Sequence, residues 1–216
     1  MPIFADLQGF VVGGKFHVKE VAVLRKGEEL THHVFRAPIP WSQLTRDEKQ
    51  QVNWLTVNYH HLHWKDGDID YRHARRLIQR AVLEGLYDDD DDEKMIVYVK
   101  GLEKTTWLRN YLGNDHSCNL LNIEIDYEEI ERLKELPTTR ALHCRRHKKN
   151  CAMENAVKLY DWWSARKREI SPLVRKSVNK SDDDRDDGGK RKRNPSTLAF
   201  HDTDDLLNLN DLSINV

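Results

Sequence analysis

The sequence predicts an α/β fold built on a mixed five-stranded sheet, with helices on both faces and a C-terminal tail outside the folded domain. Three observations lead to this prediction. Short apolar segments near the N-terminus are separated by glycine-containing turns, which is typical of a β-meander. Two later apolar segments are each followed by a helical pattern, which favours parallel strands. The length of 216 residues suits one core of moderate size plus a tail.

The first half of the chain supplies the meander and two helices. Strands are expected at 3–12, 16–24 and 31–38. Thr45 and Glu48 form a Thr-x-x-Glu capping box, which predicts the start of a helix. A second helix is expected from Tyr71 to Leu86, and the acidic run that follows at 88–92 is expected to be a solvated loop.

The second half continues the sheet. Elements are expected in this order: a strand at 95–100, a helix at 104–113, a strand at 119–125, an acidic helix at 127–136, and a last helix with an apolar stripe of Ala152, Ala156, Leu159, Tyr160 and Trp163. Right-handed crossovers give the strand order 3-2-1-4-5, with strands 1, 4 and 5 parallel. The folded domain is predicted at 1–174, and 175–216 is predicted to be a disordered tail with acidic, basic and Leu/Asp segments.

Composition excludes several classes of protein. No segment reaches the roughly 20 apolar residues of a membrane span, and the N-terminus does not resemble a secretory signal. Three cysteines favour a reducing compartment, where clustered thiols more often bind metal than pair. We therefore expect a cytoplasmic or nuclear protein, and the basic run Lys190–Arg193 matches an import signal.

A close cluster of soft ligands precedes the last helix. Cys144, His147 and Cys151 have the spacing Cys-x2-His-x3-Cys, which suits tetrahedral Zn²⁺. Glu20 on the second strand is the best candidate for a fourth ligand, because it faces the end of the first strand in this topology. The alternative is that the two cysteines are small buried apolar residues, that His147 is a loop donor, and that Glu20 pairs with Lys19 or Arg25. Cys118 is expected to be a loop thiol. No geometry is predicted for His60, His61 and His63, and at most one of His32 and His33 can join a site, because they alternate faces.

The meander followed by β-α-β crossovers is the arrangement of the RNase H-like fold, and the layout resembles the DnaQ-like 3′–5′ exonucleases. That family begins with Asp-x-Glu on its first strand and holds two metal ions with four carboxylates. Asp6 matches the first acid, but Gln8 occupies the second position and Leu108 the third. Cys151 stands where the last acid belongs. The resemblance therefore implies that ordinary two-metal exonuclease activity is lost.

The set Glu20, Cys144, His147 and Cys151 is similar to that of the Maelstrom domain, a DnaQ-like branch in which a Glu-Cys-His-Cys zinc set replaces the carboxylates. The similarity covers roughly residues 3–168. It implies zinc as the cofactor and a role in RNA processing or in transposon or virus silencing.

Residues 140–168 are strongly basic, which indicates contact with RNA or single-stranded nucleic acid. The residues expected to bind it are Arg145, Arg146, Lys148, Lys149, Lys158 and Trp162. Two functions stay open. The first is a zinc-bearing domain that binds RNA and cleaves it weakly by a route other than two-metal catalysis. The second is a non-catalytic module that recruits a protein partner through Asp204–Leu212.

Overall fold

The computed structural model describes residues 2–84, 95–113, 118–138, 140, 142–147 and 149–178, with side chains described up to Lys167. The chain divides into two units, Met1–Ala165 and Arg166–Val216, and the fold below is that of the first. The acidic run at 88–92, the basic run Lys190–Arg193 and the tail segment Asp204–Leu212 lie outside the described residues, as does Lys148. The predicted domain boundary at 174 stays a prediction.

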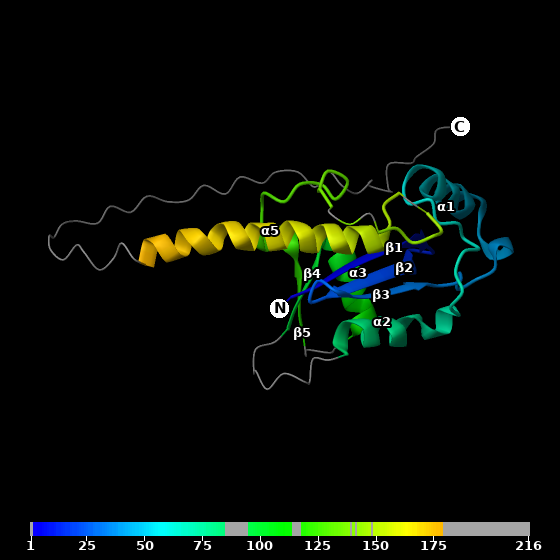
Figure 1. The fold of residues 1–216 in the computed structure, drawn as a ribbon. Coiled ribbons are helices and arrows are strands. Elements are labelled where there is room, and N and C mark those ends of the chain that lie inside the picture. The colour runs from blue at the N-terminus through cyan, green and yellow to red at the C-terminus, as the bar shows by residue number, and fades with distance from the viewer. Residues whose placement is uncertain are drawn as a thin grey trace, which may run out of the picture. The chain divides into compact units, whose positions relative to one another are not determined.

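A five-stranded mixed sheet forms the centre of the fold, in the order β3-β2-β1-β4-β5 (Figure 1). Strands β1 and β2 are antiparallel, as are β2 and β3, whereas β1 and β4 are parallel, as are β4 and β5. The strands are β1 (Ile3–Val12), β2 (Lys15–Arg25), β3 (Glu29–Val34), β4 (Met95–Val99) and β5 (Cys118–Asn122). The predicted strand order and directions are confirmed.

The β1–β2 hairpin contains the irregularity that matters for the site. Gly13 and Gly14 both have positive φ, 58° and 70°, which matches a tight two-residue hairpin turn. The register then shifts between Gln8 and Gly9, so that Gln8 pairs with Glu20 while Gly9 pairs with Val18. A Cβ on Gly9 would lie 2.3 Å from the carbonyl oxygen of His17, so only glycine fits this bulge.

Helices complete the fold and cover both faces of the sheet (Figure 1). Helices α2 and α3 pack on one face, where Ile78 and Leu108 join Leu7 in an apolar core. Helix α5 packs on the other face, where Leu159 joins Phe4. The alternation of side chains along β1 explains why neighbouring residues serve opposite cores. The helical elements are η1 (Trp41–Gln43), α1 (Arg46–Asn58), η2 (Tyr71–His73), α2 (Ala74–Leu83), α3 (Leu102–Leu112), α4 (Ile123–Asp126) and α5 (Ala152–Val178).

The start of α1 is capped as its sequence predicts. The Thr45 side chain accepts a hydrogen bond from the Glu48 backbone N–H, and the Glu48 carboxylate accepts one from the Thr45 backbone N–H. Glu48 also accepts from the backbone N–H of Gly13, which ties this helix to the β1–β2 turn. Among the described residues no helix combines the length and apolar character that crossing a membrane requires.

Three local predictions are wrong. The strand expected at 119–125 ends at Asn122, and Ile123–Asp126 form the helix α4. The segment 127–136 forms turns instead of a helix, because Ile130 and Leu136 pack into the cluster with Phe4 and Trp163 and this packing overrides the local pattern. Cys118 is the first residue of β5 instead of a loop residue, because β5 pairs with β4 from Met95 onward.

Candidate metal centre

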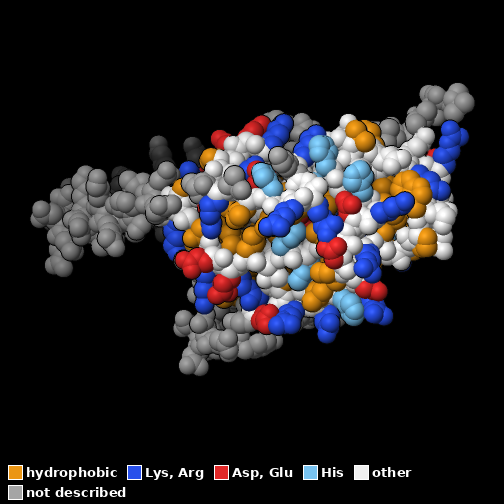
Figure 2. All heavy atoms as spheres, turned by 45° about the vertical axis from the view of Figure 1, so that its right-hand side comes forward, with side chains coloured by type: hydrophobic (Ala, Val, Ile, Leu, Met, Phe, Trp, Pro, Cys, Tyr) orange, Lys and Arg blue, Asp and Glu red, His pale blue; other side chains and the backbone are white. Residues whose placement is uncertain are grey.

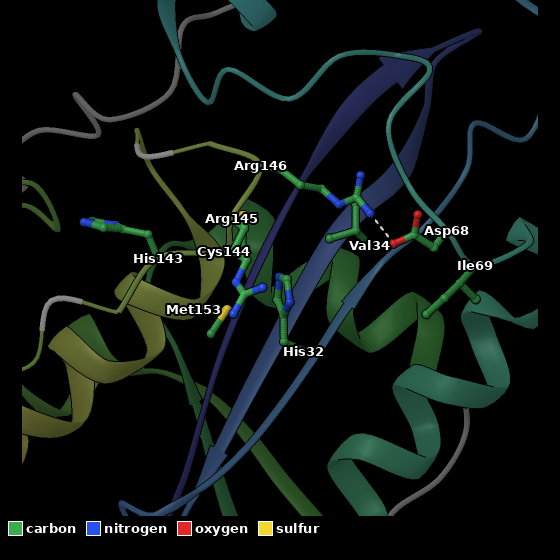
Figure 3. Close-up of a pocket in the computed structure, with 9 residues that line it drawn as sticks. All are labelled: His32, Val34, Asp68, Ile69, His143, Cys144, Arg145, Arg146 and Met153. Atoms are coloured by element: carbon green, nitrogen blue, oxygen red, sulfur yellow. Dashed lines mark hydrogen bonds and ion pairs between the residues drawn. The ribbon is translucent and has the colours of Figure 1, made fainter.

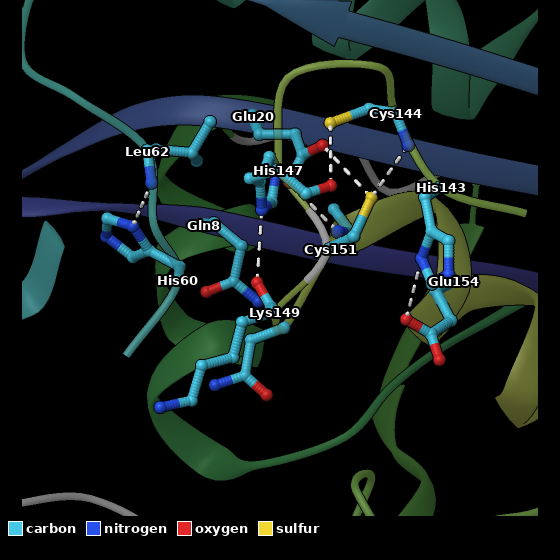
Figure 4. A network of polar contacts seen from close by, with 12 residues as sticks. Gln8, Glu20, His60, Leu62, His143, Cys144, His147, Lys149, Cys151 and Glu154 are labelled. Atoms are coloured by element: carbon cyan, nitrogen blue, oxygen red, sulfur yellow. Dashed lines mark hydrogen bonds and ion pairs between the residues drawn. The ribbon is translucent and has the colours of Figure 1, made fainter. Parts of the chain in front are cut away.

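Four side chains with metal-ligating atoms meet where β2 passes the start of α5 (Figure 4). Their ligand atoms all lie within 4.8 Å of one another, and all four residues are buried. They are Glu20, Cys144, His147 and Cys151. The fold therefore brings together the four residues predicted as ligands, although Glu20 precedes Cys151 by 131 positions.

Strand alternation places Glu20 in this cluster. Ala22, two residues further along β2, packs against Ala152 and Ala156 of α5, so Glu20 faces the same helix. Lys19 is fully buried, and its ammonium donates to the carbonyl oxygens of Phe35, Trp64 and Asp66, at 2.7 Å and 2.9 Å for the first two. The alternative in which Glu20 pairs with Lys19 is therefore wrong.

Arg25 does not pair with Glu20 either. Its guanidinium donates to the carbonyl oxygens of Ala81, at 2.6 Å, and of Glu84. These contacts join the end of β2 to α2, on the other face of the sheet from the cluster. Glu20 thus has no Lys or Arg partner among the described residues, and its carboxylate contacts His147 of the cluster and the neighbouring His32 instead.

His147 presents one ring nitrogen to the cluster and uses the other for support. Nδ1 lies 3.0 Å from the carbonyl oxygen of Lys149, so it carries a proton and donates. Nε2 lies 3.0 Å from Glu20 Oε2. Burial alone lowers the pKa of His147, but hydrogen bonds to Cys151 and Glu20 and the charge of Glu20 raise it to about 10. In the metal-free state a proton therefore occupies the Nε2 position that a metal ion would use.

The two thiols are coupled. A hydrogen bond from Cys151 lowers the pKa of Cys144, and the same interaction together with burial raises the pKa of Cys151. The backbone N–H of Cys144 also lies 3.2 Å from the Cys151 sulfur. Amide donors of this kind stabilise a thiolate and orient it toward a bound ion.

Glu20 is held by donors outside the cluster as well. His32 Nε2 lies 2.8 Å from Glu20 Oε1, and the backbone N–H of Ala152 donates to Glu20 Oε2 at 2.9 Å. Burial alone raises the pKa of Glu20, but the hydrogen bonds from His147, His32 and Ala152 lower it well below its ordinary value. The carboxylate is therefore ionised and oriented before any ion binds. Of the two neighbouring histidines only His32 joins the site, since the ring of His33 contacts Phe35.

The donor set defines what the centre can hold. It offers two sulfurs, one imidazole nitrogen and one carboxylate oxygen in a buried cluster, so the group can hold a metal ion. Four donors of this mixed type match a four-coordinate structural site better than the six to eight oxygens that Ca²⁺ needs.

Asp6, the first acid of the expected exonuclease set, accepts hydrogen bonds from three protein side chains. Asp6 is fully buried and accepts from Lys104 Nζ at 2.7 Å, from Asn155 Nδ2 at 2.8 Å and from Gln8 Nε2 at 3.1 Å. Burial alone lowers the pKa of Lys104, but the charge of Asp6 and the hydrogen bond to it raise it above its ordinary value. Leu108 lies in the apolar core with Leu7, on the other face of the strand from Asp6.

Two polar residues in this region were not predicted from the sequence, Lys104 and Asn155, and the sequence did not choose between His32 and His33. Lys104 lies four positions before Leu108, on the buried side of α3. Asn155 lies three positions after Ala152, within the buried stripe of α5. A polar residue on the buried side of a helix needs a polar partner. The positions of Lys104 and Asn155 on the apolar sides of their helices could therefore have predicted a buried polar contact.

Two of the described basic residues expected to bind nucleic acid are paired with carboxylates. Arg146 pairs with Asp68, and Lys158 pairs with Glu154 at 2.8 Å. On the face seen in Figure 2, Lys and Arg side chains (blue) are interspersed with Asp and Glu (red). Lys149 Nζ donates to the carbonyl oxygen of Asn58 at 2.5 Å, Arg145 is exposed, and the half-buried Trp162 contacts Tyr127 edge-on.

His60, His61 and His63 do not converge on a common site. His60 is buried, with Nε2 donating to the carbonyl oxygen of Gly9 at 3.2 Å and Nδ1 accepting from the backbone N–H of Leu62 at 3.1 Å. The other two are exposed.

The chain was compared with protein-family models, curated proteins and solved structures. None of these three comparisons gives a match. What is established for this chain is therefore an α/β domain with a mixed five-stranded sheet and a buried Glu-Cys-His-Cys cluster that can hold a metal ion.

Proposed function

We propose that this chain is a zinc-stabilised domain with an RNase H-like, DnaQ-type fold of the Maelstrom-like branch. It binds RNA or single-stranded nucleic acid, in RNA processing or in transposon or virus silencing. The observation that carries the proposal is the buried cluster of Glu20, Cys144, His147 and Cys151. The strand order is β3-β2-β1-β4-β5, and β2 runs opposite to the other four strands. This arrangement supports the fold assignment.

Zinc fits the donors better than other common ions. Thiolates and imidazole favour Zn²⁺ over Mg²⁺ or Ca²⁺, and four protein ligands leave no open position for substrate. The ion would have a structural role, because all four ligands are buried and come from β2, the loop at 142–147 and the residue before α5.

Two-metal exonuclease chemistry has no support at Asp6. The ammonium of Lys104 already supplies the positive charge that balances this carboxylate. Gln8 and Leu108 add no second carboxylate there. Any RNA cleavage by this chain would follow a different route, and a labelled single-stranded RNA incubated with and without a chelator tests it.

Zinc is tested first by elemental analysis of untagged protein, which should find one zinc ion per chain. Replacement with Co²⁺ should give the absorption bands of a tetrahedral thiolate site. Cys144→Ser should lose both signals, whereas Cys118→Ser, which removes the one cysteine outside the cluster, should keep them. The proposal is contradicted if the untagged wild-type protein is folded but contains no zinc and also binds no Co²⁺.

RNA binding is tested by fluorescence anisotropy with a labelled single strand at increasing salt. Arg145→Ala combined with Lys149→Ala should weaken binding and reduce its salt dependence, because phosphate contacts release counterions. Arg76→Ala is the matched control, since Arg76 is an exposed arginine on α2, on the other face of the sheet. If Arg76→Ala weakened RNA binding as much as the Arg145/Lys149 double variant, Arg145 and Lys149 would not be specific RNA contacts.

One observation favours the second function, a non-catalytic module that recruits a protein partner. Arg146 and Lys158 are already paired with carboxylates, which reduces the free positive charge of this region. The module predicts no RNA binding and pull-downs that depend on residues 197–216. The same anisotropy experiment therefore separates the two functions.

A further inference from the structure

An open pocket lies directly beside the metal centre (Figure 3). Its volume is about 620 Å³, within the roughly 300–1,000 Å³ typical of small-ligand sites. It is formed by β3, the segment before η2, the loop that carries Cys144 and the first turn of α5. The lining residues are His32, Val34, Asp68, Ile69, His143, Cys144, Arg145, Arg146 and Met153.

The polar part of the pocket contains one arginine with an unused guanidinium. Among the described residues Arg145 makes no side-chain hydrogen bond or ion pair, and it is exposed. Arg146, by contrast, pairs with Asp68, a carboxylate whose side chain is 78% exposed. Figure 3 shows this pair on the side of Ile69, with Arg145 on the side of His32 and Met153. Arg145 is therefore the group available to an incoming anion.

Three aliphatic or thioether side chains form the apolar part of the pocket wall, which also includes His32 and His143. Val34, Ile69 and Met153 contribute aliphatic and thioether groups, and Ile69 and Met153 are only half-buried. Met153 lies beside Arg145 and His32, and its flexible thioether suits the flat face of an aromatic ring. The pocket thus combines a cation that suits a phosphate with a wall that suits a base.

We propose that this pocket binds one nucleotide unit, with the phosphate at Arg145 and the base against the thioether of Met153. The inference rests on the proposed binding of RNA or single-stranded nucleic acid and names the place where one of its nucleotides is held. The arrangement is specific because the anion site and the apolar wall belong to one cavity and not to separate surfaces.

The metal centre supports the pocket from behind. Cys144 belongs to both, and His32 lines the pocket while its Nε2 contacts the ligand Glu20 at 2.8 Å. A bound ion would hold the loop at 142–147 in place, and this loop carries Arg145 and Arg146. Nucleotide affinity should therefore fall when the metal is removed.

The test uses the full chain in its metal-loaded form, labelled with ¹³C at the methionine methyl groups. The chain has three methionines, so the spectrum is simple. Met153 lines the pocket, whereas Met95 packs in the core on the other face of the sheet and serves as an internal control. Adenosine monophosphate, adenosine and inorganic phosphate are titrated separately into the millimolar range.

Adenosine monophosphate should shift the Met153 signal saturably, leave Met95 unchanged, and bind more tightly than phosphate or adenosine alone. Arg145→Ala should weaken its binding about tenfold, since charged hydrogen bonds to the phosphate are lost. The affinity of Arg145→Lys for adenosine monophosphate should lie between those of Arg145→Ala and the wild type. The affinity of Arg76→Ala should equal that of the wild type. Zinc content measured on each variant excludes loss of the metal as the cause.

Two results would overturn the pocket. The first is an unchanged Met153 signal at millimolar nucleotide, and the second is equal affinity for phosphate and adenosine monophosphate, which would leave the apolar wall without a role. Either can occur while RNA binding in the anisotropy experiment persists, and then only the pocket is wrong. Nucleotide binding at Met153 without RNA binding would instead contradict the proposed function and leave the pocket as a mononucleotide site.

Discussion

Glu20 and Asp6 are two fully buried carboxylates, and they are neutralised in different ways. Glu20 lies among groups that a metal ion can bridge, whereas Asp6 has an ammonium and two amides as partners. The difference follows from which residues face them: β2 brings Glu20 to the thiols and imidazole, and α3 brings Lys104 to Asp6. At the scale of single residues, this separates a candidate metal site from a closed ion pair.

The Asp6–Lys104 pair gives a prediction for stability. Lys104→Met should lower the free energy of unfolding by about 3–5 kcal/mol, because it leaves Asp6, whose pKa burial already raises, without its cation. Adding Asp6→Asn should recover part of the loss. Urea unfolding of the single and double variants measures both.

Lys100→Met is the matched control for this pair. Lys100 pairs with Glu124, whose side chain is 38% exposed, so solvent compensates the unpaired carboxylate. If Lys104→Met lowered the free energy of unfolding no more than Lys100→Met does, Lys104 would not be needed to compensate the buried Asp6.

His60 gives a prediction for pH dependence. Burial lowers the pKa of His60 to about 4, and a protonated Nδ1 would face the N–H of Leu62. The unfolded chain binds this proton near pH ~6.5, more tightly than the folded chain does, so stability should fall as pH drops from about 6.5 toward 4. The slope due to His60 is at most about 1.4 kcal/mol per pH unit.

His60→Gln tests this, because glutamine offers a donor and an acceptor but does not titrate in this range. Urea unfolding at several pH values should show a shallower acid slope for the variant than for the wild type. Metal loss at low pH affects both proteins, so the difference between them isolates His60. Parallel slopes would show that His60 is not the titrating group.

At the scale of elements, the β1–β2 hairpin sets the position of Glu20. The bulge after Gln8 changes the register of the hairpin directly beside the Gln8–Glu20 pair. Without the bulge the residues of β2 beyond this point would pair one position away, and Glu20 would face the opposite side of the sheet. A glycine in β1 thus decides whether β2 supplies a ligand.

Gly9→Ala should therefore weaken metal binding as well as stability. The new Cβ would meet the carbonyl of His17 at 2.3 Å and the ring of Phe16 at 2.8 Å, and overpacking of this kind costs roughly 1–3 kcal/mol. Competition with a chromophoric chelator measures the metal affinity, and urea unfolding measures the stability.

Gly14→Ala is the comparison for this change. Gly14 has a φ of 70° and nothing within 4 Å of an added Cβ, so the variant carries backbone strain without a clash at the bulge. It should lose some stability and retain its metal affinity. If Gly9→Ala kept the metal affinity of the wild type, the bulge would not be what sets the position of Glu20.

At the scale of the whole molecule, the metal centre links parts of the chain that are distant in sequence. It joins β2 to the loop at 142–147 and to the start of α5, across 131 positions. A bound ion would act as a cross-link that is absent from the unfolded chain. The adjacent pocket lies along the same junction.

Removing the metal should lower the melting temperature by roughly 10 °C, because a structural ion contributes several kcal/mol to folding at this chain length. His147→Ala should melt as low as the chelated wild type, and chelator should then have no further effect. Cys118→Ser should respond to chelator as the wild type does. Thermal unfolding with and without chelator measures all three, and an unchanged melting temperature in chelator would contradict the structural role.

Much of this arrangement follows from local pattern. The glycine turns and alternating apolar residues predicted the meander, and the Thr45–Glu48 box predicted the start of α1. The types and spacing of Cys144, His147 and Cys151 predicted a soft ligand cluster, and the strand order predicted Glu20 as its fourth member.

The sequence by itself determined most of the strands and helices and which donor types are present, because turns, caps and periodicity depend on neighbours along the chain. Only the tertiary structure decided that Lys104 and Asn155 close the Asp6 site, that His32 supports Glu20, and that 127–136 packs as turns. These outcomes depend on which distant buried atoms meet. A buried polar atom takes whichever partner the packing brings within reach, and no local pattern specifies that partner.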